Sequence, residues 1–304
     1  MRNQNSREAM QSQAPMANLA LLSSVEIGIA TKNRWKDLET TLSAISEFGL
    51  GGLRVLIFDD ASDASCPYQV RSLCDGAEIR RFSESSGYIV RRNQLAREMK
   101  AKYYLSFDDD SFPVGGSLKA AIEFAESRDD LFALSFPVYN PTNGQHQVKS
   151  IQAEPYMVRS FMGAGHLLHR ERFLDLGGYR EELVHQGEEV EISARAFMRG
   201  MHCYHFPGLN IHHVASNAGR NWHRMDFYGA RNTVLWNDWF VPPGSKILKQ
   251  SRTLGSRLLQ VARLRRLSPC EGEIAGLWDI LKYRGYRQPM SRDSYNQWQA
   301  LPPS

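Results

Sequence analysis

The chain has 304 residues, of which 42% are hydrophobic and 23% are charged, with 23 glycines and 13 prolines. This is ordinary globular composition, and it excludes disordered, collagen-like and coiled-coil proteins. The net charge of only +4 excludes a histone-like polycation, but the charge is uneven, because residues 239–270 carry seven basic side chains and no acidic one. The length allows one large domain or two ordinary ones.

The sequence shows neither a membrane span nor a disulfide framework. No apolar run reaches the roughly 18 residues that a bilayer requires. The four cysteines lack the density of a disulfide scaffold and the spacing of a zinc site, which favours a reducing compartment. We therefore expect a soluble, cytoplasmic protein. Residues 1–22, rich in Gln, Asn, Ser and Ala, are predicted to form a mobile leader.

Short apolar strands alternate with helices through the first half of the chain. The predicted strands cover residues 25–30, 55–58, 78–82, 103–107 and 132–136. Helices are predicted around 68–73, over 90–99, and where apolar residues recur at spacings of three and four, at 38–45 and 118–125. This alternation predicts parallel βαβ units in an open, doubly wound α/β sheet, which binds ligands where its strands end.

The second half is less regular. Residues 137–160 are predicted to be loop and hairpin, 166–169 and 202–206 strands, 188–198 and 222–240 helices, and 276–289 a short helix and loop. Leu254, Leu258 and Val261 share one face of a basic amphipathic helix predicted within 246–267. Such a helix either binds an anionic membrane surface or packs on the rest of the protein with its basic face in water. No nucleic-acid-binding motif accompanies the charge, so no nucleic-acid partner is expected.

The most informative motif is Asp108-Asp109-Asp110, directly after the predicted strand 103–107. Three adjacent carboxylates repel one another, and a divalent cation would relieve the repulsion. The alternative is a solvated acidic turn that caps the next helix. The triplet lies at the carboxyl end of a strand in a βαβ series, and this position favours a ligand site over the acidic turn. The chain lacks the sequence patterns of a P-loop, a dinucleotide site, a zincin and a serine-hydrolase elbow.

Two further clusters carry candidate chemistry. Glu188 and Glu189 follow Gly187 at the start of the predicted helix 188–198. They are either an ordinary acidic first turn, which the helix dipole tolerates, or they include a general base for an acceptor hydroxyl. His212 and His213 are adjacent, and adjacent side chains on an extended backbone point to opposite faces, so at most one of them reaches a given site.

Together these motifs resemble glycosyltransferase family 2, a family with the GT-A fold, over roughly residues 25–242. In the order of the family, the matching segments are Thr31-Lys32-Asn33-Arg34, Asp59-Asp60-Ala61-Ser62, Ser86-Gly87, Arg91-Arg92-Asn93, Asp108-Asp109-Asp110, Gly163-Ala164-Gly165, Gly177-Gly178-Tyr179-Arg180-Glu181 and Gly187-Glu188-Glu189. A final segment with His212-His213, Arg220 and Arg231-Asn232 is similar to the ending of bacterial transferases that build rhamnose-containing and other surface glycans.

The resemblance implies a mostly parallel, twisted GT-A sheet flanked by helices, with a C-terminal helical extension. It implies inverting transfer of a sugar from a UDP-, dTDP- or GDP-linked donor to a hydroxyl acceptor, with Mg²⁺ or Mn²⁺ as cofactor. The implied base is Glu189, with Glu188 as the alternative. The implied metal ligands are Asp110, Asp108 and either His212 or His213. The implied nucleotide-sugar contacts are Ala30, Thr31, Asn33, Arg34, Asp60 (on the base), Arg92, Asp108 and Asp109.

The resemblance also implies a division of the chain. After the leader, residues 23–115 form the nucleotide-sugar-binding half and 116–243 the acceptor-binding, catalytic half of one domain, followed by a basic helical extension at 244–304. The acceptor is a glycan, a lipid-linked molecule or a natural product, and a lipid-linked acceptor suits peripheral contact with the inner face of the plasma membrane. A sugar-phosphate nucleotidyltransferase is the alternative enzyme, although residues 30–34 lack the glycine-rich loop that it needs. A catalytically silent nucleotide-sugar-binding protein is the other alternative.

Overall fold

The computed structural model describes residues 21–215 and 221–304, so most of the expected leader and Arg220 lie outside the described residues. The strands are β1 Val25–Thr31, β2 Val55–Asp59, β3 Ala77–Arg81, β4 Tyr103–Asp108, β5 Ser111–Gly116, β6 Leu131–Ser135, β7 Val138–Asn140, β8 Gln145–Val148, β9 Tyr156–Val158, β10 Gly165–His169, β11 His202–His205 and β12 Leu209–His213. The helices are α2 Trp35–Glu47, α3 Tyr68–Arg71, α4 Tyr88–Glu98, α5 Leu118–Glu126, α6 Arg170–Asp175, α7 Glu188–Met198, α8 Trp222–Phe240, α9 Pro243–Leu264, α10 Ser268–Lys282 and α11 Arg292–Ala300, with 3-10 turns η1 Glu181–Leu183 and η2 Arg284–Tyr286.

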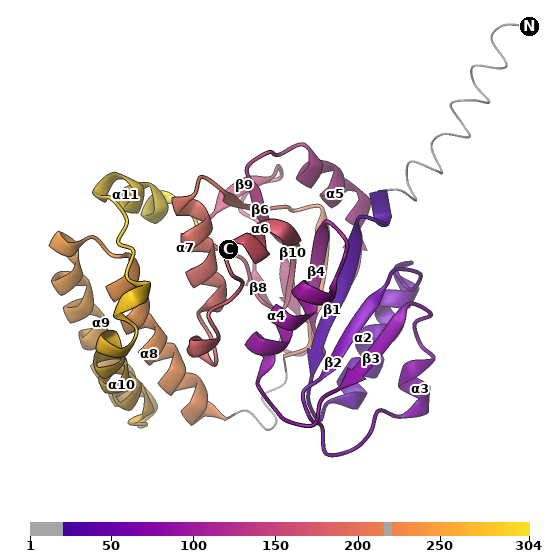
Figure 1. Cartoon of the computed structure of the whole chain (residues 1–304), viewed down its shortest axis with the longest axis horizontal. Coiled ribbons are helices and arrows are strands. Elements are labelled where there is room, and N and C mark those ends of the chain that lie inside the picture. Colours follow the sequence, from indigo (N-terminus) through magenta and orange to yellow (C-terminus); the bar gives the residue numbers. More distant parts are fainter. Residues whose placement is uncertain (1–20, 216–220) are drawn as a thin grey trace, which may run out of the picture.

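An eight-stranded sheet with the order β3-β2-β1-β4-β10-β6-β11-β9 forms the centre of the molecule (Figure 1). Its first four strands are parallel, as expected for βαβ units. Strand β10 then runs antiparallel to both of its neighbours, β4 and β6, and β9 is antiparallel at the far edge. The expected α/β class with a mostly parallel sheet is therefore confirmed, with reversed strands in the second half of the chain.

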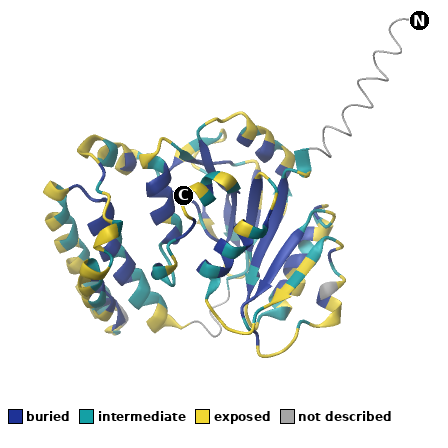
Figure 2. Cartoon of the chain, viewed as in Figure 1, coloured by how far each residue is buried: buried dark blue, intermediate teal, exposed yellow. Residues whose placement is uncertain are grey.

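Helices cover both faces of this sheet, so its central strands are buried (Figure 2). Leu38, Leu42 and Ile45 of α2, together with the apolar residues of α5, pack against one face. On the other face, apolar residues of α4, α6, α7 and α8 pack against side chains that include Phe58 and Tyr104. Successive strand residues point to opposite faces, which is why β4 can supply Leu105 to one core and Tyr104 to the other.

A small second sheet, in the order β5-β12-β7-β8, lies beside the end of β4. Strand β5 begins at Ser111, directly after the acidic triplet, and pairs antiparallel with β12 so that His213 lies opposite Ser111. The sequence does not indicate β5, because its residues SFPVGG contain one proline and two glycines. This pairing brings His213 to the triplet although about a hundred residues separate them.

The remaining expected elements agree with the structure in place and type. Helices α7 and α8 have the predicted bounds, and the segment 137–160 contains the predicted hairpin as β7 and β8. Strand β12 includes both His212 and His213. Helices α6 and α11 were not predicted, and α10 is longer than the short helix expected near residue 276.

Helices α8 to α11 form a helical unit at the side of the sheet (Figure 1). Helix α10 approaches α8 closely because two glycines face it. A β-carbon on Gly272 would lie 2.1 Å from the Phe227 carbonyl oxygen, and one on Gly276 would lie 2.7 Å from Val234 Cβ. Among the residues described, no helix combines the length and the apolar character that crossing a bilayer demands.

Substitution of Gly272 by alanine is expected to destabilise the protein, because the new methyl group would collide with backbone that cannot move aside. Overpacking of this kind costs about 1–3 kcal/mol in the free energy of unfolding, measured by urea or thermal denaturation. The matched control is Gly255→Ala in α9, where the β-carbon would meet open space. It is expected to raise stability by up to about 1 kcal/mol through helix propensity. A Gly272→Ala protein as stable as the parent would contradict the close approach.

Candidate active site

A cleft of about 570 Å³ lies where β1, β2 and β4 end, and it collects almost all of the candidate residues. Eleven of the expected site residues line it: Ala30, Thr31, Arg34, Asp60, Arg92, Asp108, Asp109, Asp110, Glu188, Glu189 and His213. Asn33 and His212 do not. The separate segments of the chain that carry these residues thus meet at one edge of the sheet.

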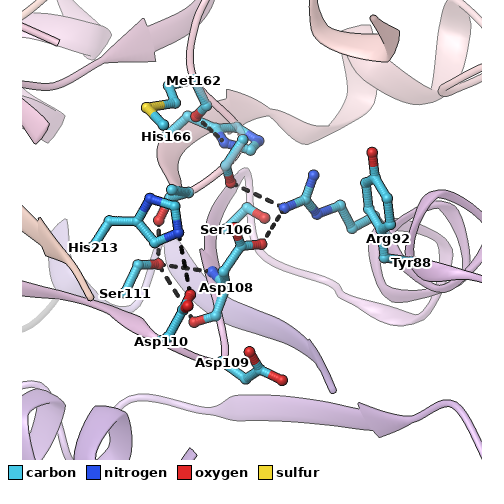
Figure 3. A network of polar contacts seen from close by, with 12 residues as sticks. Tyr88, Arg92, Ser106, Asp108, Asp109, Asp110, Ser111, Met162, His166 and His213 are labelled. Atoms are coloured by element: carbon cyan, nitrogen blue, oxygen red, sulfur yellow. Dashed lines mark hydrogen bonds and ion pairs between the residues drawn. The ribbon is translucent and has the colours of Figure 1, made fainter. Parts of the chain in front are cut away.

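The three aspartates of the triplet point in different directions (Figure 3). Asp109 turns toward the first strand, where Thr31 Oγ1 donates a hydrogen bond of 2.7 Å to its carboxylate and Arg34 forms an ion pair at 2.8 Å. Its carbonyl oxygen accepts a hydrogen bond from Thr41 of α2. Burial raises the pKa of Asp109 to about 7, although Arg34 and Thr31 act against this. Asp109 therefore anchors the triplet to β1 and α2.

Asp108, Asp110 and His213 form a cluster whose ligand atoms all lie within 4.8 Å of one another (Figure 3). His213 Nε2 lies 3.3 Å from Asp110 Oδ1, which is buried and accepts no hydrogen bond within the part of the chain described. Burial opposes ionisation of Asp110, but His213 and Arg34 beside it lower its pKa to about 2. An ionised, buried carboxylate next to a second carboxylate and an imidazole fits a divalent cation.

The two histidines separate as adjacent strand residues must. His213 faces the triplet, and its Nδ1 lies 2.7 Å from Gln147 Oε1. The ring of His212 lies on the opposite side of β12, 6.0 Å from Phe112 and 5.6 Å from Tyr139 between ring centres. The side chain of His212 therefore faces away from the carboxylates, and His213 is the histidine that joins their cluster.

Asn33, another residue that the sequence predicts to contact the nucleotide sugar, does not line the cleft. Its backbone takes the left-handed conformation, with φ of +58°. Its amide groups exchange hydrogen bonds with Asp63, and its backbone N–H donates to Ser62 Oγ. Asn33 therefore shapes the loop after β1, and the neighbouring Lys32, which the sequence did not single out, lines the cleft in its place.

Arg34 lies across the triplet. Besides Asp109, its guanidinium contacts Asp110 Oδ2 at 2.7 Å and Asp37 at 2.8 Å. These carboxylates outweigh the burial of Arg34 and raise its pKa above the usual value. A cationic group at this position can meet a phosphate as well as a carboxylate.

Arg92 connects the triplet to the second acidic cluster. Its side chain is only 4% exposed, and it pairs with Asp108, with Glu188 at 3.5 Å and with Glu189 at 4.0 Å. It also donates a hydrogen bond to the Gly163 carbonyl and lies over the ring of Tyr88, 4.9 Å from its centre. Burial alone would lower the pKa of Arg92, but Asp108 and the two glutamates raise it, so that its positive charge is secure.

Asp60 was expected to contact the nucleobase, and it does line the cleft. Its carboxylate is already bonded to Ser85 Oγ at 2.7 Å, to the backbone N–H groups of Ser86 and Gly87 at 2.8 and 2.9 Å, and to Arg91 Nε at 2.7 Å. Burial opposes its ionisation, yet these donors lower its pKa. Asp60 therefore holds the loop before α4 in place at the edge of the cleft.

Glu188 and Glu189 begin α7, behind Gly187 in the left-handed conformation. The Glu188 side chain is 1% exposed, whereas that of Glu189 is 19% exposed, so Glu189 is the more accessible carboxylate. Burial raises the pKa of both, and for Glu189 the neighbouring Glu188 raises it further. Gly163 leaves room for Glu189, because a β-carbon there would lie 2.4 Å from Glu189 Oε1.

Several residues that line the cleft were not singled out from the sequence. They are Tyr88, Met162, His185, Gln186, Asn221, Arg224 and Met225. Tyr88 could have been found, because it follows the Ser86-Gly87 motif directly and its hydroxyl accepts a hydrogen bond from the Gln186 backbone. The last three come from the start of α8, which no motif connects to the cleft.

The architecture is that of GT-A glycosyltransferases, because several solved structures of such enzymes match it. S. aureus TarS in complex with UDP-GlcNAc has a TM-score of 0.59 and 14% identity, over 85% of this chain and 80% of that one. The mannosyltransferase PcManGT from Pyrobaculum calidifontis, in complex with GDP-Man and Mn²⁺, has a TM-score of 0.55 and 17% identity, over 90% and 78%. GalNAc-T7 with UDP, GalNAc and Mn²⁺ has a TM-score of 0.56 and 16% identity over 65% of this chain, which spans only 44% of the GalNAc-T7 chain.

Sequence comparison defines the family. The family model of glycosyl transferase family 2 matches residues 26–177, half of the chain. The chain belongs to glycosyl transferase family 2. The predicted family and the predicted glycosyltransferase class are confirmed, whereas the likeness to enzymes of rhamnose-containing glycans stays a prediction. A search of curated proteins found no significant match.

Replacing Arg92 with methionine is expected to destabilise the fold strongly, because Glu188 and Asp108 would lose their buried counter-charge. Breaking a buried ion pair costs about 3–5 kcal/mol, which denaturant unfolding would measure. The control is Arg97→Met, since Arg97 is 56% exposed and lies 3.8 Å from Glu181. That exposed pair is worth less than about 1 kcal/mol. Equal losses in the two variants would show that Arg92 is not the link between the clusters.

Proposed function

We propose that this protein transfers a sugar from a nucleoside-diphosphate sugar to an acceptor hydroxyl with inversion at the anomeric carbon. One observation carries the proposal: the cluster of Asp108, Asp110 and His213 shares a single cleft with the accessible carboxylate of Glu189. The first group suits the diphosphate of a donor, and the second suits the hydroxyl of an acceptor.

The donor in this proposal is a UDP-, dTDP- or GDP-linked sugar. Family membership supports a nucleotide-sugar donor, and three of the similar structures are complexes with UDP, UDP-GlcNAc and GDP-Man. Ala30, Thr31, Arg34 and Asp60 line the part of the cleft at the ends of β1 and β2, where we place the nucleotide. A deoxysugar such as rhamnose stays a prediction from the sequence ending alone.

Asp108, Asp110 and His213 would hold the cofactor, Mg²⁺ or Mn²⁺. A divalent cation bound there supplies positive charge that stabilises the departing diphosphate. Two of the similar structures are complexes with Mn²⁺. Arg34 and Arg92 border the same cleft and add fixed positive charge around it.

Glu189 is the base in the mechanism that we propose. Its carboxylate takes the proton from the acceptor hydroxyl while the hydroxyl oxygen bonds to the anomeric carbon, and the bond to the diphosphate breaks on the opposite side. The transition state has oxocarbenium character, as in glycoside chemistry generally. The raised pKa of Glu189 makes it a stronger base than an ordinary glutamate, at the cost of activity in acid.

The division of labour follows the order of the chain. We assign donor binding to residues 23–115 and acceptor binding with catalysis to 116–243, with 244–304 as a helical extension. The cysteines have neither the density nor the spacing of a disulfide framework, which supports a cytoplasmic, reducing location. The acceptor is the hydroxyl of a glycan, a lipid-linked molecule or a natural product, and a lipid-linked acceptor would require contact with an anionic membrane.

Nucleoside diphosphates and nucleotide sugars, tested with and without Mn²⁺ or Mg²⁺, are expected to raise the unfolding temperature in a metal-dependent way. The shift grows with occupancy as RT ln(1 + [L]/Kd). His213→Ala should weaken metal binding more than about tenfold, since even the loss of a residue that only hydrogen-bonds to a metal ligand lowers metal affinity by about that factor. His212→Ala is the matched control and should keep the metal-dependent shift. If no nucleotide stabilises the protein, with or without metal, the proposed binding of a nucleotide-sugar donor is wrong.

Glu189→Gln is expected to retain the donor-dependent thermal shift but to lose transfer by roughly 10²–10⁴-fold, the usual contribution of a general base. Glu189 must be ionised to act as a base, and burial and the neighbouring Glu188 raise its pKa well above that of an ordinary glutamate. Activity of the parent enzyme should therefore fall as the pH is lowered, already at pH values where an ordinary glutamate is still ionised. The assay measures transfer through the nucleoside diphosphate that the reaction releases. A Glu188→Gln enzyme that is the inactive one, with Glu189→Gln active, would reassign the base.

A further inference from the structure

Helix α9 packs on α8 with its polar side. Lys246 forms an ion pair with Asp238 at 2.9 Å, Gln250 bonds to Asn237 and to the Val234 carbonyl, and Thr253 bonds to Asn237. One turn further on, Arg257 donates to Thr233 Oγ1 at 3.0 Å. These positions recur every three to four residues, so they define one face of α9. The face that meets the protein is therefore hydrophilic.

The opposite face of α9 is apolar and open to solvent. Its exposed residues are Ile247, Leu248, Leu254, Leu258 and Leu259, with exposed fractions that reach 79% for Ile247. A helix on a globular protein normally turns its apolar stripe to the core and its polar face to water. The sequence predicts an amphipathic helix that either binds a membrane or packs on the protein with its basic face in water. In the structure, the apolar residues of this helix are exposed to solvent.

Helix α10 has the same inverted arrangement. Gly272 and Gly276 lie against α8, and its acidic residues also turn toward that helix, with Glu271 paired to His223 and Asp279 to Arg231. The outer side presents an apolar stripe with helical spacing, consisting of Ile274, Leu277, Trp278 and Leu281. Trp278 is 73% exposed.

This exposure is concentrated in one part of the molecule. Of the seventeen large hydrophobic side chains that are exposed among the described residues, ten lie between 247 and 281. Helix α8 separates α9 and α10 from the central sheet (Figure 1), and none of these ten residues lines the cleft. A large apolar patch away from the site marks an interaction surface.

The charge around the patch selects the partner. Arg252, Arg263 and Arg265 of the α9 segment and Lys282 at the end of α10 are exposed. No acidic residue occurs between 239 and 270, and those of α10 are turned toward α8 or buried. Two copies of the chain meeting through this surface would bring like charges together, whereas anionic lipid headgroups would neutralise them.

We propose that α9 and α10 together dock the protein on an anionic membrane surface, with the apolar stripes inserted among the acyl chains and the flanking cations at the headgroups. Binding then combines burial of apolar area with electrostatic attraction. This docking does not depend on the proposed transferase reaction, because it uses no residue of the cleft.

Flotation of the full chain with vesicles tests the proposal. Binding is expected to vesicles of phosphatidylcholine with phosphatidylglycerol at low ionic strength, and to be weaker at high ionic strength or with phosphatidylcholine alone. The Trp278 fluorescence should shift to the blue on binding and be quenched by brominated lipid. Absence of binding to the anionic vesicles at low ionic strength would overturn the proposal.

Two sets of variants separate the two contributions. Arg252→Gln with Arg263→Gln should weaken binding roughly thirtyfold, from about fivefold for each cation near the surface. Leu258→Ser, Leu259→Ser and Trp278→Ser together should abolish it. Ile151→Ser, which changes an exposed apolar residue elsewhere, is the control and should bind as the parent does.

Circular dichroism melts and sedimentation velocity complete the test. All these side chains are exposed, so the variants should keep the unfolding temperature of the parent. Apolar variants that float as well as the parent would overturn the proposal. The proposal would also be overturned if the parent protein failed to bind vesicles but formed a concentration-dependent dimer that the apolar variants disrupt. The surface would then fit a second copy of the chain.

Discussion

The buried guanidinium of Arg92 is the interaction on which the active site depends. A cleft that holds the acidic end of β4 and the acidic start of α7 concentrates negative charge where water is scarce, and such charge must be compensated. Arg92 contacts Asp108, Glu188 and Glu189 from α4, so one cation joins elements that are far apart in the sequence. The same contact places the candidate metal ligands and the candidate base on either side of one arginine.

The three aspartates of the acidic triplet can take different roles because their side chains have different surroundings. Asp109 is bound into the core by Thr31 and Arg34, which leaves Asp108 and Asp110 to face the cleft. Asp110 meets His213 only because β5 and β12 pair antiparallel beside the end of β4. Neighbouring carboxylates thus have opposite pKa shifts, about 7 for Asp109 and about 2 for Asp110. Burial outweighs Arg34 and Thr31 at Asp109, whereas His213 and Arg34 outweigh burial at Asp110.

The predictions made from sequence succeed where local patterns determine the outcome. The βαβ alternation predicts the strands and helices of the first half, and the acidic motifs fall at a strand end and at a helix start as expected. They fail where the structure depends on distant pairing. The composition of β5 is unfavourable for a strand, and this segment is extended because it pairs with β12. The residues at the start of α8 line the cleft only because of how that helix packs. Asn33 and His212 belong to matching motifs, yet their side chains turn to the loop and to the far face of the strand.

The sequence by itself determined the class of protein, the order of its elements and the residue types available for chemistry, because periodicity and motif spacing are local properties. Tertiary structure alone decided that His213 faces the carboxylates, that Glu189 is more accessible than Glu188, and that α9 packs through its polar side. The physical reason is the same in each case. A period of 2.0 or 3.6 residues says which side chains share a face, but only the neighbouring elements determine which face meets the protein and which meets solvent.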